Sequence, residues 1–181
     1  MPKSRYSLGA MIMHWLIAIA VITNWQLAQQ AEGLPRDQAG PLMDVHKALG
    51  MTILALTILR IIWRLTHDQP AMSAALKGWE VILAKIVHAL FYIILISLPV
   101  LGWIGSSSFG GGIDMFGLFT LPPLPVANDR DAGGLIFSVH ATMGTALILL
   151  VGLHILGALK HQFIDRNGEL YRMLPFGTPK A

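Results

Sequence analysis

The chain has 181 residues, of which 54% are hydrophobic and 13% charged, and it contains no cysteine. An average soluble domain is about 45–50% apolar and about 25% charged, so this composition excludes an ordinary soluble enzyme and a disordered chain. Four bilayer crossings of roughly 20 residues each would take about 80 residues, which leaves no room for a large extramembrane catalytic domain. The lack of cysteine excludes disulfides, thiolate nucleophiles, Cys-ligated iron–sulfur clusters and covalently attached c-type haem.

Four apolar segments predict four transmembrane helices, at about residues 8–28, 42–65, 79–104 and 134–160. The first segment is too long for the apolar region of a signal peptide and lacks a small-residue cleavage site, so we expect it to be retained. Pro99 in the third segment is expected to kink that helix by freeing the carbonyl of Leu95. Because short connections favour antiparallel neighbours, the predicted fold is an all-α, up-down four-helix bundle in a membrane, with residues 1–181 as one domain.

The three connections between these segments differ in length. Residues 31–41 and 66–78 form short links, whereas residues 105–133 form a long one that contains Gly110-Gly111-Gly112 and Pro122-Pro123. We expect the long connection to lie on the membrane face, where a short interfacial helix could form.

The distribution of Lys and Arg sets the expected orientation. One side of the predicted bundle collects ten basic residues: Lys3, Arg5, Arg60, Arg64, Lys77, Lys85, Lys160, Arg166, Arg172 and Lys180. The other side has three: Arg36, Lys47 and Arg130. We therefore expect both termini to be cytoplasmic. The net positive charge of the chain is then explained by its membrane topology and by contact with anionic lipid, and it implies no nucleic-acid partner.

Histidine is the residue that carries the chemistry of this sequence. Six of the seven histidines lie within or at the ends of the apolar segments: His14, His46, His88, His140, His154 and His161. An ionisable side chain inside a membrane is costly and marks a functional site by default. A single histidine could be a helix–helix hydrogen bond, but one or more on each of four segments points to a shared site.

His140 and His154 are expected to share one face of the fourth helix. Fourteen residues turn an α-helix to about 40° short of four full turns and advance it by about 21 Å. That spacing suits two stacked haems, one in each half of the bilayer, with a second axial histidine supplied by a partner helix. Two imidazoles per iron leave no open position for oxygen, so the expected role is electron transfer.

Depth along the helices predicts the pairing of these ligands in part. His46 and His140 both lie on the outer side and form the outer pair. The inner pair contains His154 with either His14 or His88, and depth does not separate the two. A rival pairing joins His14 to His88 across alternate helices.

Two glycines favour a bulky cofactor beside the outer pair. Gly50 follows His46 by four residues and Gly144 follows His140 by four. Each stands one turn from a predicted ligand, where a flat macrocycle needs space. Small residues also allow close helix packing in membranes. For either glycine taken alone, helix packing explains its presence about as well as a cofactor does.

An ordered set of motifs along nearly the whole chain resembles the prokaryotic cytochrome b561 family, whose relatives include the cytochrome b subunits of formate dehydrogenases and nickel–iron hydrogenases. The motifs are His14-Trp15, His46-Lys47 with Gly50, Leu59-Arg60-Ile61-Ile62-Trp63-Arg64, His88, Leu98-Pro99-Val100-Leu101-Gly102-Trp103, Phe116-Gly117-Leu118-Phe119, His140, His154, His161-Gln162-Phe163-Ile164-Asp165-Arg166 and Arg172-Met173-Leu174-Pro175. Any one fragment is weakly specific, but the ordered set is specific.

The resemblance implies a multi-pass cytochrome of the bacterial inner membrane with two b haems. Its iron ligands would be His14 with His154 for the inner haem and His46 with His140 for the outer haem. Other basic side chains could contact a quinone or a haem propionate: His88, His161, Arg60, Arg64 and Lys160 on the inner side, and Lys47 on the outer side. Basic residues at helix ends more often serve topology and snorkelling.

The resemblance also implies a quinone-linked oxidoreductase. Family members exchange electrons with ubiquinone, and some are similar to superoxide oxidases, which pass electrons from superoxide outside the membrane to quinone. We therefore expect a periplasmic donor, with superoxide among the candidates. A superoxide oxidase would need a positively charged outer surface to attract the anion. The outer side of this chain has three basic residues, Arg36, Lys47 and Arg130, and six acidic ones, so it does not match that requirement.

Two other functions are weighed against this one. The chain could be a haem-carrying anchor subunit that links a dehydrogenase or hydrogenase to quinone. Its protein partners could be a second copy of the chain or a redox partner subunit. A metal or proton transporter would need histidines that converge at one depth along a polar pathway. The histidines here separate into two layers and no segment carries an acidic residue at its centre, which disfavours transport.

Overall fold

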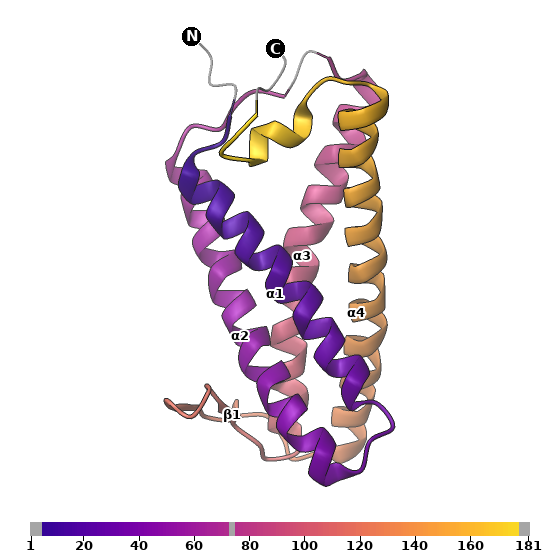
Figure 1. Ribbon diagram of the computed structural model, residues 1–181. Helices are drawn as coiled ribbons and strands as arrows, with labels where there is room; N and C mark the ends of the chain where they lie inside the picture. The colour runs from indigo at the N-terminus through magenta and orange to yellow at the C-terminus, as the bar shows by residue number, and fades with distance from the viewer. Residues whose placement is uncertain (1–4, 73–74, 178–181) are drawn as a thin grey trace.

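The structure is a computed structural model, and it describes residues 5–72 and 75–177. Four long helices dominate the described part of the chain: α1 (Leu8–Ala31), α2 (Arg36–Thr66), α3 (Gly78–Ser108) and α4 (Arg130–Leu159). They run up and down, so that the start of α1 and the segment that follows α4 lie at the same end of the bundle (Figure 1). We call this the termini end and the opposite one the hairpin end. Lys3 and Lys180 of the predicted basic side lie outside the described residues.

The predicted helices are confirmed, and all four are long and apolar enough to cross a membrane. Two of them begin earlier than predicted, α2 by nearly two turns and α4 by about one turn. Pro35, whose ring presets its φ, stands at the N-cap of α2. The Asp129 side chain caps α4 by accepting hydrogen bonds from the N–H groups of Asp131 and Ala132. Polar caps and first turns lie outside the apolar runs, so hydropathy places these helix starts too late.

The bundle consists of two helix pairs. α1 packs along α2 and α3 packs along α4, while α2 and α3 join the pairs and α1 meets α4 at few positions. A buried apolar layer lies across the middle of the bundle: Ile17, Val21, Ile53, Leu95, Leu98 and Leu147. This layer separates the polar side chains of the two ends.

The outward faces of the helices are apolar as well. Leu149 and Leu156 of α4 are 70% and 65% exposed. The most apolar window of α4 is only 6% buried inside the protein. Such a surface is stable only against lipid, which agrees with a membrane-spanning bundle.

A β-hairpin stands where a short interfacial helix was expected, so that expectation is wrong. Strand β1 (Ile113–Asp114) pairs antiparallel with β2 (Thr120–Leu121), beside α2 (Figure 1). Gly112 is required at its base, because a Cβ there would lie 2.7 Å from the backbone oxygen of Leu121. The side chain of Ile113 is 2% exposed, and its strand packs against α2.

The C-terminal segment closes the termini end. α4 continues into a π-helical turn, η1 (Lys160–Ile164), and a 3₁₀ turn, η2 (Glu169–Met173), follows it across the end of the bundle (Figure 1). Trp15 Nε1 donates to the backbone oxygen of Met173 at 2.8 Å. The buried Arg172 bonds Glu169 and the Ala71 backbone oxygen. The C-terminal segment is therefore hydrogen-bonded to α1 and to the α2–α3 connection.

Candidate functional site: two groups of histidines

The first group lies toward the hairpin end, where His46 of α2 faces His140 of α4. Their ring centres are 5.9 Å apart and their planes are inclined by 74°. His46 Nδ1 lies 3.0 Å from the backbone oxygen of Asn24, and His140 Nδ1 lies 3.0 Å from that of Leu98. A backbone carbonyl accepts a hydrogen bond from Nδ1–H, so the proton of each ring is on Nδ1 and Nε2 keeps the lone pair that can ligate a metal.

The second group lies toward the termini end and contains three histidines. His154 of α4 faces His14 of α1, with ring centres 6.2 Å apart and planes inclined by 76°. His154 also faces His88 of α3, with ring centres 5.9 Å apart. Phe91 packs edge-on to His154 at 5.4 Å. The structure thus brings together all three residues that sequence depth could not separate.

The separations match two imidazoles on opposite sides of one metal ion. A metal–imidazole bond is about 2.0 Å and the nitrogen is about 1.1 Å from its ring centre, so two such ring centres stand about 6 Å apart. The His46–His140 and His14–His154 separations of 5.9 and 6.2 Å fit this value. The residues present therefore fit axial ligation of haem iron.

Two glycines leave room for additional atoms beside the first group. A Cβ on Gly144 would meet no described atom within 4 Å, and one on Gly50 would meet only Asn24 Nδ2 at 3.6 Å. Leu147 lies seven residues from both His140 and His154 and is 6% exposed within the central apolar layer. The two groups of histidines therefore lie on either side of an apolar layer.

Sequence reasoning missed the residues that hold His46 and His140. Asn24 and Leu98 act through backbone oxygens, which leave no sequence signature. Gly102 lets α3 approach His140 closely, because a Cβ there would lie 3.2 Å from Cε1 of that ring. The sequence offers one signal for this contact: Gly102 lies one turn after Leu98 in an apolar helix, and a glycine there indicates close approach of another group.

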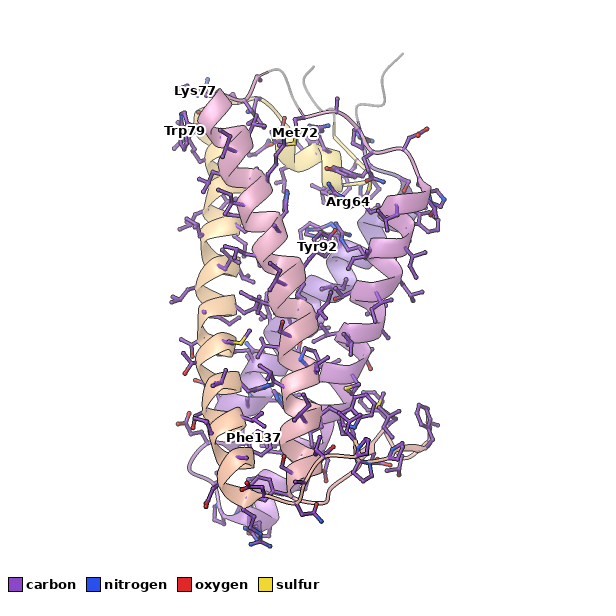
Figure 2. All side chains as sticks on the ribbon, turned by 180° about the vertical axis from the view of Figure 1, so that it is seen from behind. Arg64, Met72, Lys77, Trp79, Tyr92 and Phe137 are labelled. Carbon is purple, nitrogen blue, oxygen red and sulfur yellow. The ribbon has the colours of Figure 1, made fainter. Side chains whose placement is uncertain are left out.

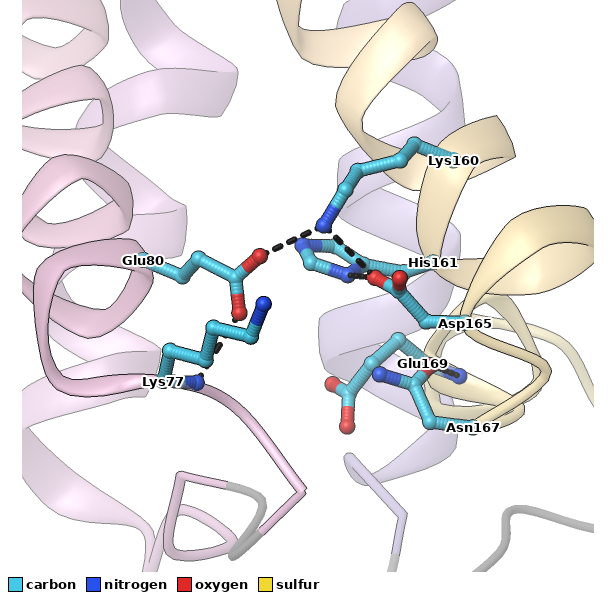
Figure 3. Close-up of polar contacts among 7 residues, drawn as sticks. All are labelled: Lys77, Glu80, Lys160, His161, Asp165, Asn167 and Glu169. Carbon is cyan, nitrogen blue, oxygen red and sulfur yellow. Dashed lines mark hydrogen bonds and ion pairs between the residues drawn. The ribbon is translucent and has the colours of Figure 1, made fainter.

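Three predicted contact residues are engaged with acidic side chains. Lys160 Nζ lies 2.5 Å from Glu80 and 2.8 Å from Asp165, and His161 Nδ1 lies 2.6 Å from Asp165 (Figure 3). Lys47 pairs with Asp44 at 2.7 Å. The ammonium of Lys160, followed by the ring of His161, holds the pKa of the Asp165 carboxyl below its usual value.

The predicted Arg60 and Arg64 lie together at a recess of the termini end. Arg60 Nη1 donates to the backbone oxygen of Ala10 at 2.6 Å. The recess is lined by Tyr6, Ala10, Arg60, Trp63, Arg64, Gln69 and Tyr92. Figure 2 shows Arg64 and Tyr92 near each other at this end. Guanidinium and phenol groups are hydrogen-bond donors, so the recess suits a carboxylate or carbonyl oxygen.

Four membrane-length helices with facing histidines between them are the architecture of a membrane-bound b-type cytochrome. The chain belongs to the prokaryotic cytochrome b561 family, whose sequence profile matches residues 5–176. It is thus a multi-pass protein of the bacterial inner membrane that serves haem-based electron transfer.

Similar proteins cover almost the full chain. The chain is 28% identical to "Probable superoxide oxidase CybB" of Yersinia pestis over 94% of this chain and 96% of the relative. It is 27% identical to "Cytochrome b561 homolog 2" of Escherichia coli K12, over 94% and 91%. It is 24% identical to "Cytochrome b561 homolog 1" of the same organism, over 95% and 98%.

Proposed function

We propose that this protein carries electrons across the membrane from a periplasmic donor to ubiquinone through two bis-histidine b haems. A bound b haem supplies one-electron redox chemistry, while the chain sets ligation, position and water exclusion. The observation that carries the proposal is the matched geometry of two histidine pairs that each have one member on α4, with ring centres 5.9 and 6.2 Å apart. The termini end would face the cytoplasm and the hairpin end the periplasm.

In this proposal His46 and His140 are the outer ligands. The backbone oxygens of Asn24 and Leu98 fix the tautomer of each ring and orient its Nε2. Such hydrogen bonds also make the imidazole a stronger donor to iron. The two carbonyls are therefore positioning groups for the outer site.

For the inner site we propose His14 with His154. α3 and α4 pack along each other, whereas α1 meets α4 at few positions. A macrocycle fits between helices that stand apart more easily than between helices in contact. This packing favours His14 over His88 as the partner of His154, in agreement with the family resemblance. His88 is then left at the inner site as a contact to quinone or propionate.

The donor groups that line the recess of the termini end support contact with a quinone oxygen on this side. Arg60 and Arg64 offer guanidinium donors there, and Tyr92 offers a phenol. Lys160 and His161 are less suited to this role, because acidic side chains already engage them. Proximity to water at this end would let protons reach a reduced quinone.

Superoxide as the donor rests on the name of one relative, and the charges of this chain do not favour it. Six acidic residues lie on the hairpin side: Glu32, Asp37, Asp44, Asp114, Asp129 and Asp131. Lys47, the basic residue next to His46, is paired with Asp44. An anion would therefore meet little electrostatic attraction at this face.

The haem-to-protein ratio of the purified chain tests the proposal. Reduced-minus-oxidised and pyridine spectra should give two low-spin b haems per chain, and anaerobic addition of a ubiquinol analogue should reduce them. One haem would contradict the two-site assignment. No haem after expression with adequate haem supply would overturn the proposal as a whole.

A further inference from the structure

We propose that the tip of the β1–β2 hairpin inserts into the lipid leaflet that surrounds the hairpin end of the bundle, at the boundary of headgroups and acyl chains. The tip consists of Phe116, Leu118 and Phe119, whose exposed fractions are 52%, 81% and 56%. Three large apolar side chains at one turn form an unusual surface for a loop in water. The proposed partner is the bilayer itself.

Three backbone N–H groups of the turn donate hydrogen bonds within the hairpin. Met115 N–H donates to the backbone oxygen of Phe119 at 2.8 Å, and Leu118 N–H donates to that of Met115 at 3.1 Å. Gly117 N–H donates to the Asp114 carboxylate at 2.8 Å. Unpaired amides are costly where water is scarce, so this internal pairing suits a segment that enters the membrane boundary.

The conformation of Phe116 directs an aromatic ring away from the protein at a conformational cost. Its φ is +58°, in the left-handed region that bulky residues rarely adopt. Gly117 follows with φ +75°. A turn of this shape usually takes Gly or Asn at both positions. An aromatic residue at the first of them gains little in water, whereas burial of its ring in lipid would offset the strain.

The base of the hairpin is fixed to two helices. Ile113 is buried in the strand that packs on α2, and Trp103 Nε1 of α3 donates to the backbone oxygen of Pro122 at 3.1 Å. Ser107 Oγ accepts from the N–H of Leu124 at 2.9 Å. The hairpin projects sideways from the bundle beside α2 in both views (Figures 1 and 2). The space beside a membrane-spanning helix is filled by lipid, so the tip is held over the bilayer.

The charge of this connection favours apolar insertion over attraction to headgroup phosphates. Asp114 is the only ionisable residue between residues 106 and 128. Its carboxylate is used by Gly117 N–H. Contact with lipid should therefore depend on buried apolar area, and it should be insensitive to salt and to the fraction of anionic lipid.

Site-directed spin labelling in nanodiscs tests this proposal, because the chain has no native cysteine. A nitroxide is attached to L118C in the haem-loaded protein, and its collisions with oxygen and with a water-soluble nickel chelate are measured. Leu149→Cys supplies a lipid-facing reference and Asn128→Cys a water-facing one from the same outer connection. Haem content and absorption spectra confirm that each labelled protein is folded.

We expect the label at position 118 to lie between the labels at positions 149 and 128, with higher oxygen accessibility and fewer nickel-chelate collisions than at position 128. The result should persist at high salt and in purely zwitterionic lipid. Nickel accessibility equal to that at position 128 would overturn the proposal. Dipolar broadening between labels on two chains would also overturn it, because it would show that a second copy covers the tip.

Discussion

The backbone oxygen of Leu98 in α3 lies 3.0 Å from Nδ1 of His140 in α4. The same ring lies against Gly102, the residue one turn further along α3. α3 therefore supplies both a hydrogen-bond acceptor, just before Pro99, and room for the imidazole, just after it. α3 donates no outer ligand in the proposed scheme, yet it determines the orientation of one.

Substitution of Gly102 by alanine should weaken the outer site selectively. Its Cβ would lie 3.2 Å from His140 Cε1, so the ring must move by a few tenths of an ångström or more. We expect loss or spectral perturbation of one haem and retention of the other, measured as haem per chain and as low-spin EPR signals. G134A is the control, because a Cβ there meets no described atom within 4 Å. Equal spectra for the two variants would contradict the role assigned to Gly102.

Alanine variants of His14 and His88 should separate the inner ligand from its neighbour. Because both rings face His154, at 6.2 and 5.9 Å, distance does not distinguish them. We expect H14A to lower the ratio from two haems per chain to one, and H88A to retain two. The reverse pattern would transfer the ligand role to His88. Each ratio is measured on detergent-purified protein of matched oligomeric state.

Leu147 should carry much of the stability of the central apolar layer. It is 6% exposed and lies midway between the histidines of α4. Leu147→Ala leaves a cavity in a packed layer, which typically costs about 2–5 kcal/mol. Leu149→Ala is the matched control, since Leu149 is 70% exposed to the lipid side. Thermal unfolding of the haem-loaded protein should show a clear decrease for the first variant and a much smaller one for the second.

The pair of Lys47 with Asp44 should suppress reaction with anionic donors. Their charged atoms are 2.7 Å apart, and Lys47 follows His46 directly. Asp44→Asn leaves the ammonium without this partner, so we expect faster haem reduction by superoxide and a stronger decrease of that rate with salt. Asp37→Asn changes the net charge equally and is the control. Identical rates for the two variants would show that pairing of Lys47 has no effect.

The carboxyl of Asp165 should stabilise the end of α4 in a pH-dependent way. Lys160 and His161 lower its pKa below the usual value of 3.8, so the folded state favours the ionised form. That contribution is present above about pH 4 and is lost as the pH falls through the lowered folded value. Asp165→Asn should remove this part of the acid dependence. Hydrogen exchange of the η1 amides between pH 3 and pH 6 measures it.

The sequence predicted the helices better than their contacts. Hydropathy located all four spans, and helical periodicity placed His140 and His154 on one face of α4, because both are local properties of the chain. The hairpin was missed because its strands are only two residues long and depend on Gly112 and on packing against α2. The acceptors at Asn24 and Leu98 are backbone atoms, so composition and spacing carry no information about them.

α4 contributes a histidine to both proposed pairs, while α1 and α2 each contribute to one. It is also the last of the four helices in the order of the chain. During synthesis, neither pair can be completed while only the first three helices have entered the membrane. In the proposed scheme, binding of either haem would therefore report that the final helix has been inserted, and maturation of the cytochrome would be a late step that truncated or stalled chains cannot reach.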